Sequence, residues 1–259
     1  AGRRLGRQLP VAIQIDSGMS RLGMPPSEVG SLAPDALEGL DLRLVMSHLA
    51  CADEPENPAN EAQRNAFELL RRRLPDAPAS LANSSGIFLG ERFHFDLARP
   101  GAALYGVNPT PGHDNPMQQA VRLSAKVIQT RELPIDIGIG YGHAYRTTRP
   151  TRTATIALGY ADGWPRRAGM AAWYESVRLP FVGRVSMDSI VLDISELPPG
   201  TLHAGDLVDL ICSEQTVDDV AEAAGTIGYE ILTGLGGRFH RIYDYNGQGA
   251  ATHRQGCST

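Results

Sequence analysis

The first part of the chain repeats one pattern: a short apolar run, a polar loop with glycine, and then helical material. The run at 11–15 is followed at once by a polar loop at 16–23, and the runs at 42–48 and 79–84 also end in polar residues. A further segment at 93–99 leads to a fourth strand. The unit recurs about every 35 residues, as in a (β/α) barrel, where functional residues lie at the carboxyl ends of the strands. About four units fit before Gly112, whereas a closed barrel needs eight, so the sequence predicts a partial TIM-type barrel.

One helix in this part has clear boundary signals. Asn57 suits the capping position and Pro58 the first helical position, while Phe67, Leu70 and Leu74 form an apolar stripe. We therefore expect a helix that begins at Pro58 and whose stripe faces the core.

The pattern changes after the linker-like sequence at 109–112. Short strands are predicted at 123–130, 153–158, 179–185, 190–194 and 207–211. Thr216 and Asp219 offer a capping box that would open a short helix. The fold class is thus α/β plus all-β. We expect a barrel domain at 1–114, a β domain at 115–245 and a polar tail at 246–259 with no assigned role.

Composition excludes several classes of partner. The 259 residues carry a net charge of -5, which provides no field for nucleic acid or an anionic membrane, and no run approaches the ~20 apolar residues of a membrane span. Cys51, Cys212 and Cys257 fit neither a disulfide framework nor a zinc pattern. We expect reduced thiols in a cytoplasmic protein without a metal.

The beginning of the chain resembles neither a start nor a secretory signal. Its first residues, AGRRLGR, lack a methionine and an apolar core, and a strand follows almost directly. We expect the sequence to be part of a longer protein.

Two polar clusters at strand ends are candidate site residues. The glycines and proline at 159–165 predict a loop that presents Tyr160, Asp162 and Trp164 rather than burying them. A second strand delivers 186–188. From the pattern alone, ordinary β-domain turns explain these clusters equally well.

A resemblance separates the two interpretations. The sequence GYADGWPRR at 159–167, followed by GRVSMD at 183–188, resembles the C-terminal domain of alanine racemases, and matching motifs extend from about residue 11 to residue 243. These are fold type III enzymes that use pyridoxal 5'-phosphate (PLP) to interconvert L- and D-alanine. The resemblance implies the C-terminal half of a PLP-binding barrel followed by the β domain, in a head-to-tail homodimer whose sites use both subunits.

The resemblance also implies the catalytic residues. Tyr141, in the loop at 139–145, falls on the position of a base that the partner subunit supplies. An isolated tyrosine titrates near ~10, so it needs nearby positive charge or hydrogen bonds to act as a base at neutral pH. His48 and Arg99 resemble the pair that links this tyrosine to the cofactor ring, where the arginine faces the pyridine nitrogen. Taken singly, such a histidine is more often only hydrogen-bonded and such an arginine more often on the surface.

Phosphate binding would fall to Asn83, Ser84 and the backbone amides of Gly101 and Ala102, because hydroxyls and unpaired N–H groups suit an anion. These short motifs are weak signals by themselves.

Four further residues resemble the substrate site. Arg21 matches the arginine that steadies the tyrosine and the substrate carboxylate. Tyr160, Met187 and Asp188 match the part of the pocket and entry contributed by the other subunit. A core methionine is the alternative interpretation of Met187.

Three departures from the family pattern stand out. Gln14 occupies the place where many members have a carbamylated lysine, and Gly237 the place where some have a tyrosine. The family's PLP lysine lies on the first barrel strand, and no residue before Val11 matches it. Lys126 is the chain's single lysine and lies in a β run without a motif, which is typical of a solvated lysine.

We therefore expect an alanine racemase that supplies D-alanine for cell-wall peptidoglycan, present as a piece that is inactive alone. The alternatives are a related fold type III PLP decarboxylase, against which GYADGWPRR argues, and a non-catalytic remnant or regulatory partner that has kept the racemase fold.

Overall fold

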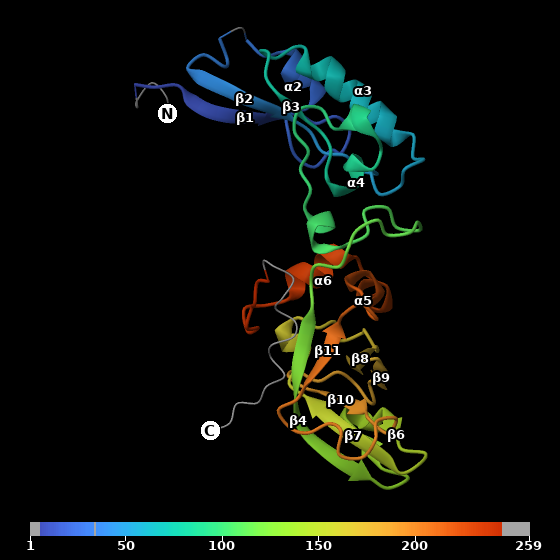
Figure 1. Cartoon of the computed structure of the whole chain (residues 1–259). Helices are drawn as coiled ribbons and strands as arrows, with labels where there is room; N and C mark the ends of the chain where they lie inside the picture. The colour runs from blue at the N-terminus through green and yellow to red at the C-terminus, as the bar shows by residue number, and fades with distance from the viewer. Residues whose placement is uncertain (1–5, 34, 245–259) are drawn as a thin grey trace. The chain divides into compact units, whose positions relative to one another are not determined.

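The computed structural model describes residues 6–33 and 35–244, so the predicted tail at 246–259 lies outside the described residues (Figure 1). These residues form two compact units. The first comprises the described residues up to Ser124 together with Asp209–Tyr229, and the second comprises Ala125–Val208 and the described residues from Glu230. The predicted boundary after residue 114 stays a prediction.

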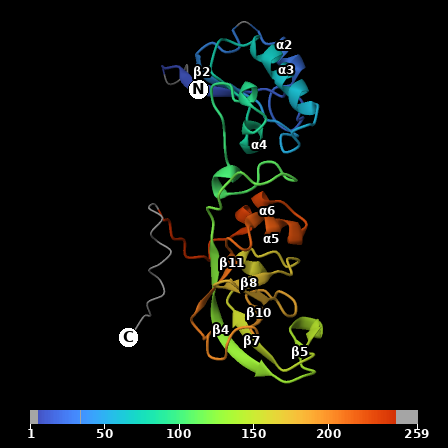
Figure 2. The same cartoon turned by 45° about the vertical axis from the view of Figure 1, so that its right-hand side comes forward.

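The first unit contains a three-stranded parallel sheet in the order β1-β2-β3. Its strands are β1 (Leu9–Gln14), β2 (Leu40–Met46) and β3 (Ala79–Ser80). The helices are α2 (Pro26–Gly30), α3 (Ala59–Arg71) and the short α4 (Ser84–Ile87), of which α2 and α3 lie beside each other (Figure 2). Parallel strands with helical crossovers form an arc of a (β/α) barrel, as the sequence predicts.

Helix α3 begins one residue later than predicted, with Pro58 in the capping position and Asn57 before it. The Asn57 side-chain oxygen accepts a hydrogen bond from the amide of Ala59 at 3.0 Å. Phe67, Leu70 and Leu74 are buried in the core of this unit, where Phe67 meets Phe95 edge-on at 5.1 Å between ring centroids. The predicted stripe is confirmed.

The fourth strand to which the segment at 93–99 was expected to lead does not form, because among the described residues no strand lies between Ser80 and Leu123. Glu91–Phe93 forms a 3-10 turn, and Phe95 has a φ of 52°, which takes the backbone out of the extended region. The segment still returns to β3, because the amides of Asp96 and Leu97 both donate to the Ala79 carbonyl, at 3.0 and 3.2 Å. Helix α2 is also much shorter than the helical material expected between the polar loop at 16–23 and the apolar run at 42–48.

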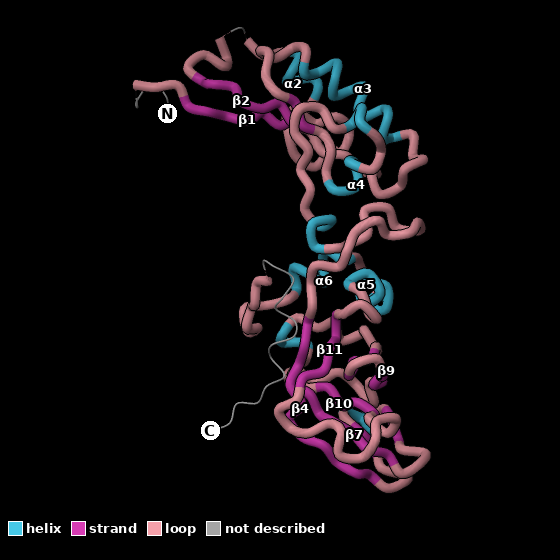
Figure 3. Tube along the Cα trace, in the orientation of Figure 1, coloured by secondary structure: helices cyan, strands magenta, loops and turns pink. Residues whose placement is uncertain are grey.

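The β-rich part contains a six-stranded sheet in the order β10-β7-β4-β11-β8-β9 (Figure 3). Its strands are β4 (Leu123–Leu133), β7 (Thr151–Ile156), β8 (Ala171–Tyr174), β9 (Val177–Pro180), β10 (Ile190–Asp193) and β11 (Leu207–Ile211). The predicted all-β character is confirmed. A separate antiparallel pair, β5 (Gly138–Ile139) and β6 (Tyr145–Arg146), flanks the loop of Tyr141.

Two helices follow β11. Helix α5 (Val217–Ala224) begins with the predicted capping box: the Thr216 hydroxyl accepts from the Asp219 amide at 3.2 Å, and the Asp219 carboxylate accepts from the Thr216 amide at 2.7 Å. Helix α6 spans Gly228–Gly234. None of the described helices has the length and apolar character needed to cross a membrane.

Candidate functional site

The Arg99 guanidinium lies across the ends of β2 and β3. One terminal nitrogen donates to the Ser80 hydroxyl, and the other donates to the carbonyl oxygens of Ser47 at 2.6 Å and of Leu81 at 3.4 Å. Within 6–33 and 35–244, no carboxylate pairs with it. Burial lowers the pKa of Arg99 from its high ordinary value. A positive charge is thus held in place by neutral acceptors alone.

His48 lies two residues after the end of β2, and it is close in sequence to Ser47, whose carbonyl binds Arg99. Desolvation lowers its pKa most, and the positive charges of Arg99 and Arg21 lower it further. The charges of two predicted residues thus act on a third in the first unit, and together with burial they favour a neutral imidazole.

The backbone next to His48 is fixed by a residue that the sequence analysis missed. The buried side chain of Gln63, on α3, donates to the His48 carbonyl at 3.1 Å and accepts from the Ala50 amide at 2.8 Å. An amide can serve both bonds because it carries a donor and an acceptor. The only sequence signal is a polar residue within the buried face of a helix.

The predicted phosphate residues gather around the start of α4. The buried Ser84 hydroxyl oxygen accepts from the amides of Gly101 at 2.8 Å and Ala103 at 3.3 Å. Asn83 caps α4 by accepting from the Gly86 amide at 2.8 Å. Of the predicted amides, that of Gly101 is thus occupied by Ser84, whereas the Ala102 amide has no acceptor within the described chain.

This donor set suits an anion. Because the Ser84 oxygen already accepts two hydrogen bonds, its own proton remains available for donation. Together with the Ala102 amide, it offers two donors to a phosphate oxygen.

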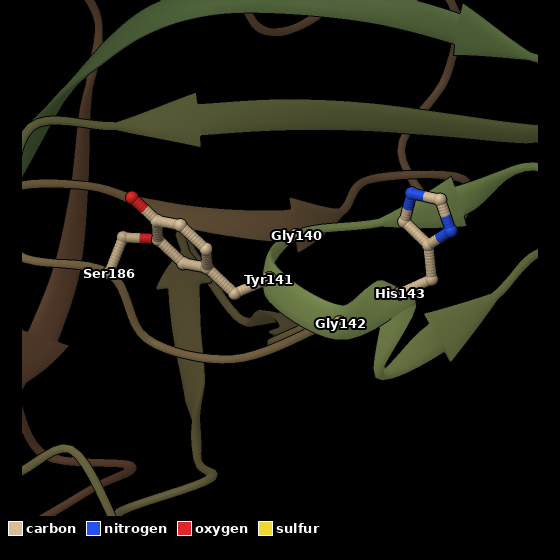
Figure 4. A pocket seen from close by; sticks show the side chains of 5 residues that line it. All are labelled: Gly140, Tyr141, Gly142, His143 and Ser186. Carbon is tan, nitrogen blue, oxygen red and sulfur yellow. The ribbon is translucent and has the colours of Figure 1, made fainter.

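In the second unit, Tyr141 lies in the β5–β6 loop. Gly140 and Gly142 have φ angles of 70° and 66°, conformations that suit glycine, and they shape the turn that presents the tyrosine. Tyr141 is 68% exposed and lines an open pocket of about 650 Å³ together with Gly140, Gly142, His143 and Ser186. In Figure 4 the phenol extends toward Ser186, whereas His143 lies on the other side of the loop.

The two polar clusters of the sequence form one local structure. The amides of Tyr160 and Ala161 donate to the carbonyls of Ser186 at 3.1 Å and Met187 at 2.8 Å. A Cβ at Gly159 would lie 2.4 Å from backbone atoms of Met187 and Asp188, so glycine is required for this approach. Tyr160 and Met187 are 42% and 56% exposed, and the interpretation of Met187 as a core residue is wrong. Asp188 is also exposed.

The expectation that Trp164 and Asp162 are presented by the loop is wrong. Trp164 is buried and packs against Phe181 at 6.0 Å between ring centroids. The buried Asp162 carboxylate accepts from the Gly159 amide at 2.9 Å and pairs with Arg238 at 3.2 Å. Both side chains hold the loop in shape from within, while Tyr160 faces outward.

Among the known proteins that resemble this chain are alanine racemases. The family model for the alanine racemase N-terminal domain matches residues 1–109, and that for the alanine racemase C-terminal domain matches residues 120–243. A catabolic alanine racemase of Mesorhizobium japonicum is 68% identical over 92% of the chain, and an alanine racemase of Brucella canis is 47% identical over 96%. The crystal structure of the Bartonella henselae alanine racemase with covalently bound pyridoxal phosphate is 40% identical over 94% of the chain, with a TM-score of 0.85.

The chain belongs to the alanine racemase family. It covers 63% of the Mesorhizobium relative, 67% of the Brucella relative and 68% of the Bartonella structure. Less than two thirds of the most similar of these relatives is therefore represented.

Lys126 does not match the PLP lysine of the alanine racemase pattern and has the environment of a solvated residue. It lies on β4 with its side chain exposed. Gly237 has open space around the position of a Cβ, so this departure does not disturb the packing of the fold.

Proposed function

We propose that this chain supplies most of the active site of a PLP-dependent alanine racemase that interconverts L- and D-alanine for cell-wall peptidoglycan. The observation that supports this best is the positive charge of Arg99, anchored by neutral acceptors beside a histidine that favours its neutral form. A guanidinium does not release its proton. It therefore suits a pyridine nitrogen that is to stay unprotonated.

The residues present fit the cofactor. Arg99 would hold the ring nitrogen, and Ser84, Ala102 and Asn83 surround the place for the phosphate, with Gly101 completing its wall. PLP, when bound, supplies an electron sink for the charge that develops as the α-proton leaves. The Bartonella relative carries this cofactor covalently.

The chain's own residues divide the remaining work. Tyr141 moves the proton at the α-carbon through its phenolic oxygen, and it would reach the site from the partner subunit of a homodimer. His48 links the tyrosine to Arg99 by hydrogen bonds, and Arg21 orients the substrate carboxylate. Tyr160, Met187 and Asp188 would line the entry from the partner's side. Cytoplasmic location stays a prediction from the cysteines.

Racemisation needs a second proton carrier on the face of the α-carbon opposite Tyr141, and Lys126, exposed on β4, is not placed to be that group. A lysine from an additional segment is therefore needed, and we expect the chain by itself to be inactive. The exposed position of the single lysine, Lys126, also favours a second candidate, a non-catalytic partner that has kept the racemase fold.

Complementation tests this proposal. The part of the Mesorhizobium relative that this chain does not match is co-expressed with the chain, and formation of D-alanine from L-alanine is measured. We expect activity only when both pieces are present. Tyr141→Phe should lower kcat by at least about 100-fold, because it removes an acid–base group. Tyr145→Phe, in the same hairpin, is the matched control and should retain activity.

A complex that forms and binds PLP without racemase activity would reject the enzyme and favour the non-catalytic partner. An equal loss of activity in both tyrosine variants would reject the role given to Tyr141.

A further inference from the structure

One carboxylate holds the loop that carries Arg21. Oδ1 of Asp16 accepts hydrogen bonds from three successive backbone amides, those of Gly18 at 2.9 Å, Met19 at 3.0 Å and Ser20 at 3.0 Å. The bond from Ser20 is the largest cause of a lowered pKa of Asp16, and that from Gly18 follows. The carboxylate is therefore ionised at neutral pH and binds the loop through charge-assisted bonds.

The backbone just before Arg21 requires such support. Ser20 has a φ of 58°, in the left-handed region that residues with a Cβ rarely adopt. Its amide is one of the three that donate to Asp16, at 3.0 Å. Release of this bond would let Ser20 return to an ordinary conformation, which would redirect the next residue.

The base of the loop is also closed by backbone contacts. The Asp16 amide donates to the Met24 carbonyl at 2.8 Å, and the Met24 amide donates to the Gln14 carbonyl at 2.9 Å. The side chain of Gln14 donates to the Leu22 carbonyl at 3.3 Å. This side chain thus holds the backbone next to Arg21 rather than its guanidinium.

The Arg21 side chain makes no hydrogen bond or ion pair with any residue that the structure describes. Only the backbone of its loop therefore constrains where this exposed side chain can reach. Its charge nevertheless acts on His48, whose pKa it lowers after desolvation and Arg99. The pKa of His48 is therefore the quantity through which a displacement of the Arg21 charge can be detected.

We propose that Asp16 is the positioning residue for Arg21, holding the loop at 16–23 in the conformation from which the guanidinium charge acts on His48. The use of Arg21 to bind a substrate carboxylate rests on the proposed function. The placement of Arg21 by Asp16 does not.

Titration of His48 by NMR in the full chain tests this without catalysis, with the ring signal assigned by His48→Gln. We expect Arg21→Gln to raise the pKa of His48, because a nearby positive charge is lost. Asp16→Ala should raise it toward the Arg21→Gln value. Asp16→Asn, which keeps an acceptor oxygen without the charge, should raise it less. Adding Asp16→Ala to Arg21→Gln should change nothing further.

The sign of the shift separates positioning from direct electrostatics. Loss of the Asp16 negative charge acting directly on His48 would lower its pKa, whereas release of Arg21 raises it. The matched control is Asp41→Asn, which removes an exposed carboxylate paired with Arg43 at 2.7 Å and should leave His48 unchanged.

An unchanged or lowered pKa of His48 in both Asp16 variants would overturn the proposal. So would a double variant in which Asp16→Ala, added to Arg21→Gln, raises the pKa of His48 as much as it does alone. Asp16→Asn decides the matter if Asp16→Ala does not fold, as judged from its amide spectrum. If the upward shifts occur while complementation yields no racemase, the positioning role stands and the proposed function fails.

Discussion

In the second unit, the loop of Tyr160 and the segment of Met187 meet through a close approach of backbone atoms at Gly159. Gly159 is buried and has an ordinary extended backbone, with a φ of -156°, so its glycine is not needed for conformation. It is needed because backbone atoms of Met187 and Asp188 occupy the place of a Cβ. Tyr160 and Met187 are exposed side by side on the two segments that this contact joins.

We expect Gly159→Ala to lower the free energy of unfolding by about 1–3 kcal/mol, the usual cost of forcing a methyl group into a packed site. Chemical denaturation followed by tryptophan fluorescence measures this, because Trp164 is buried close to the loop. Gly169→Ala is the control: Gly169 is exposed and has no atom within 4 Å of its Cβ position. Equal stability of the two variants would contradict the steric explanation.

At the scale of elements, the start of a helix is determined by capping residues that are close in sequence. Thr216 and Asp219 satisfy each other's backbone amides at the start of α5, and this pairing depends on residues three apart. Helix α3 likewise begins after Asn57 and Pro58, because the Asn57 side chain accepts a hydrogen bond from the amide of Ala59.

Thr216→Ala should lower the free energy of unfolding by about 1 kcal/mol, since the Asp219 amide loses its acceptor. Urea denaturation monitored by circular dichroism measures the change. Thr216→Ser keeps the hydroxyl and should remain close to the parent chain. A loss of the same size in the serine variant would show that the methyl group, not the cap, stabilises this start.

At the scale of the whole molecule, the first unit has an open sheet. Strand β1 is an edge strand in the order β1-β2-β3, and no strand pairs with its outer edge among residues 6–33 and 35–244. Unpaired backbone groups on such an edge are a template for other chains. We therefore expect this polypeptide alone to self-associate.

A charge on this edge should reduce the association. Ala12 is exposed on β1, so Ala12→Lys should shift the chain toward monomer in light scattering. The control Ala36→Lys adds the same charge at an exposed turn of the same unit and should have a smaller effect. A monodisperse monomer for the parent chain would contradict the expectation.

Much of the fold could be predicted because its signals are local. The apolar runs placed β1, β2 and most strands of the β domain, and β11 matches its predicted range of 207–211. A fourth strand was predicted after the segment at 93–99 because the sequence does not indicate the left-handed turn at Phe95. Trp164 was mistaken for a presented side chain because loop signals describe the backbone, and burial depends on what packs above it.

The sequence by itself determined the order of the elements, the helix caps and the chemical types of residues at the strand ends, because periodicity and capping involve neighbours in the chain. Only the tertiary structure decided which atoms hold these residues. Arg99 is bound to groups of Ser80 and Ser47, 19 and 52 residues away, and Gln63 reaches back 15 residues to the carbonyl of His48. Such contacts form only after the strands pair and α3 covers them, so no local pattern encodes them.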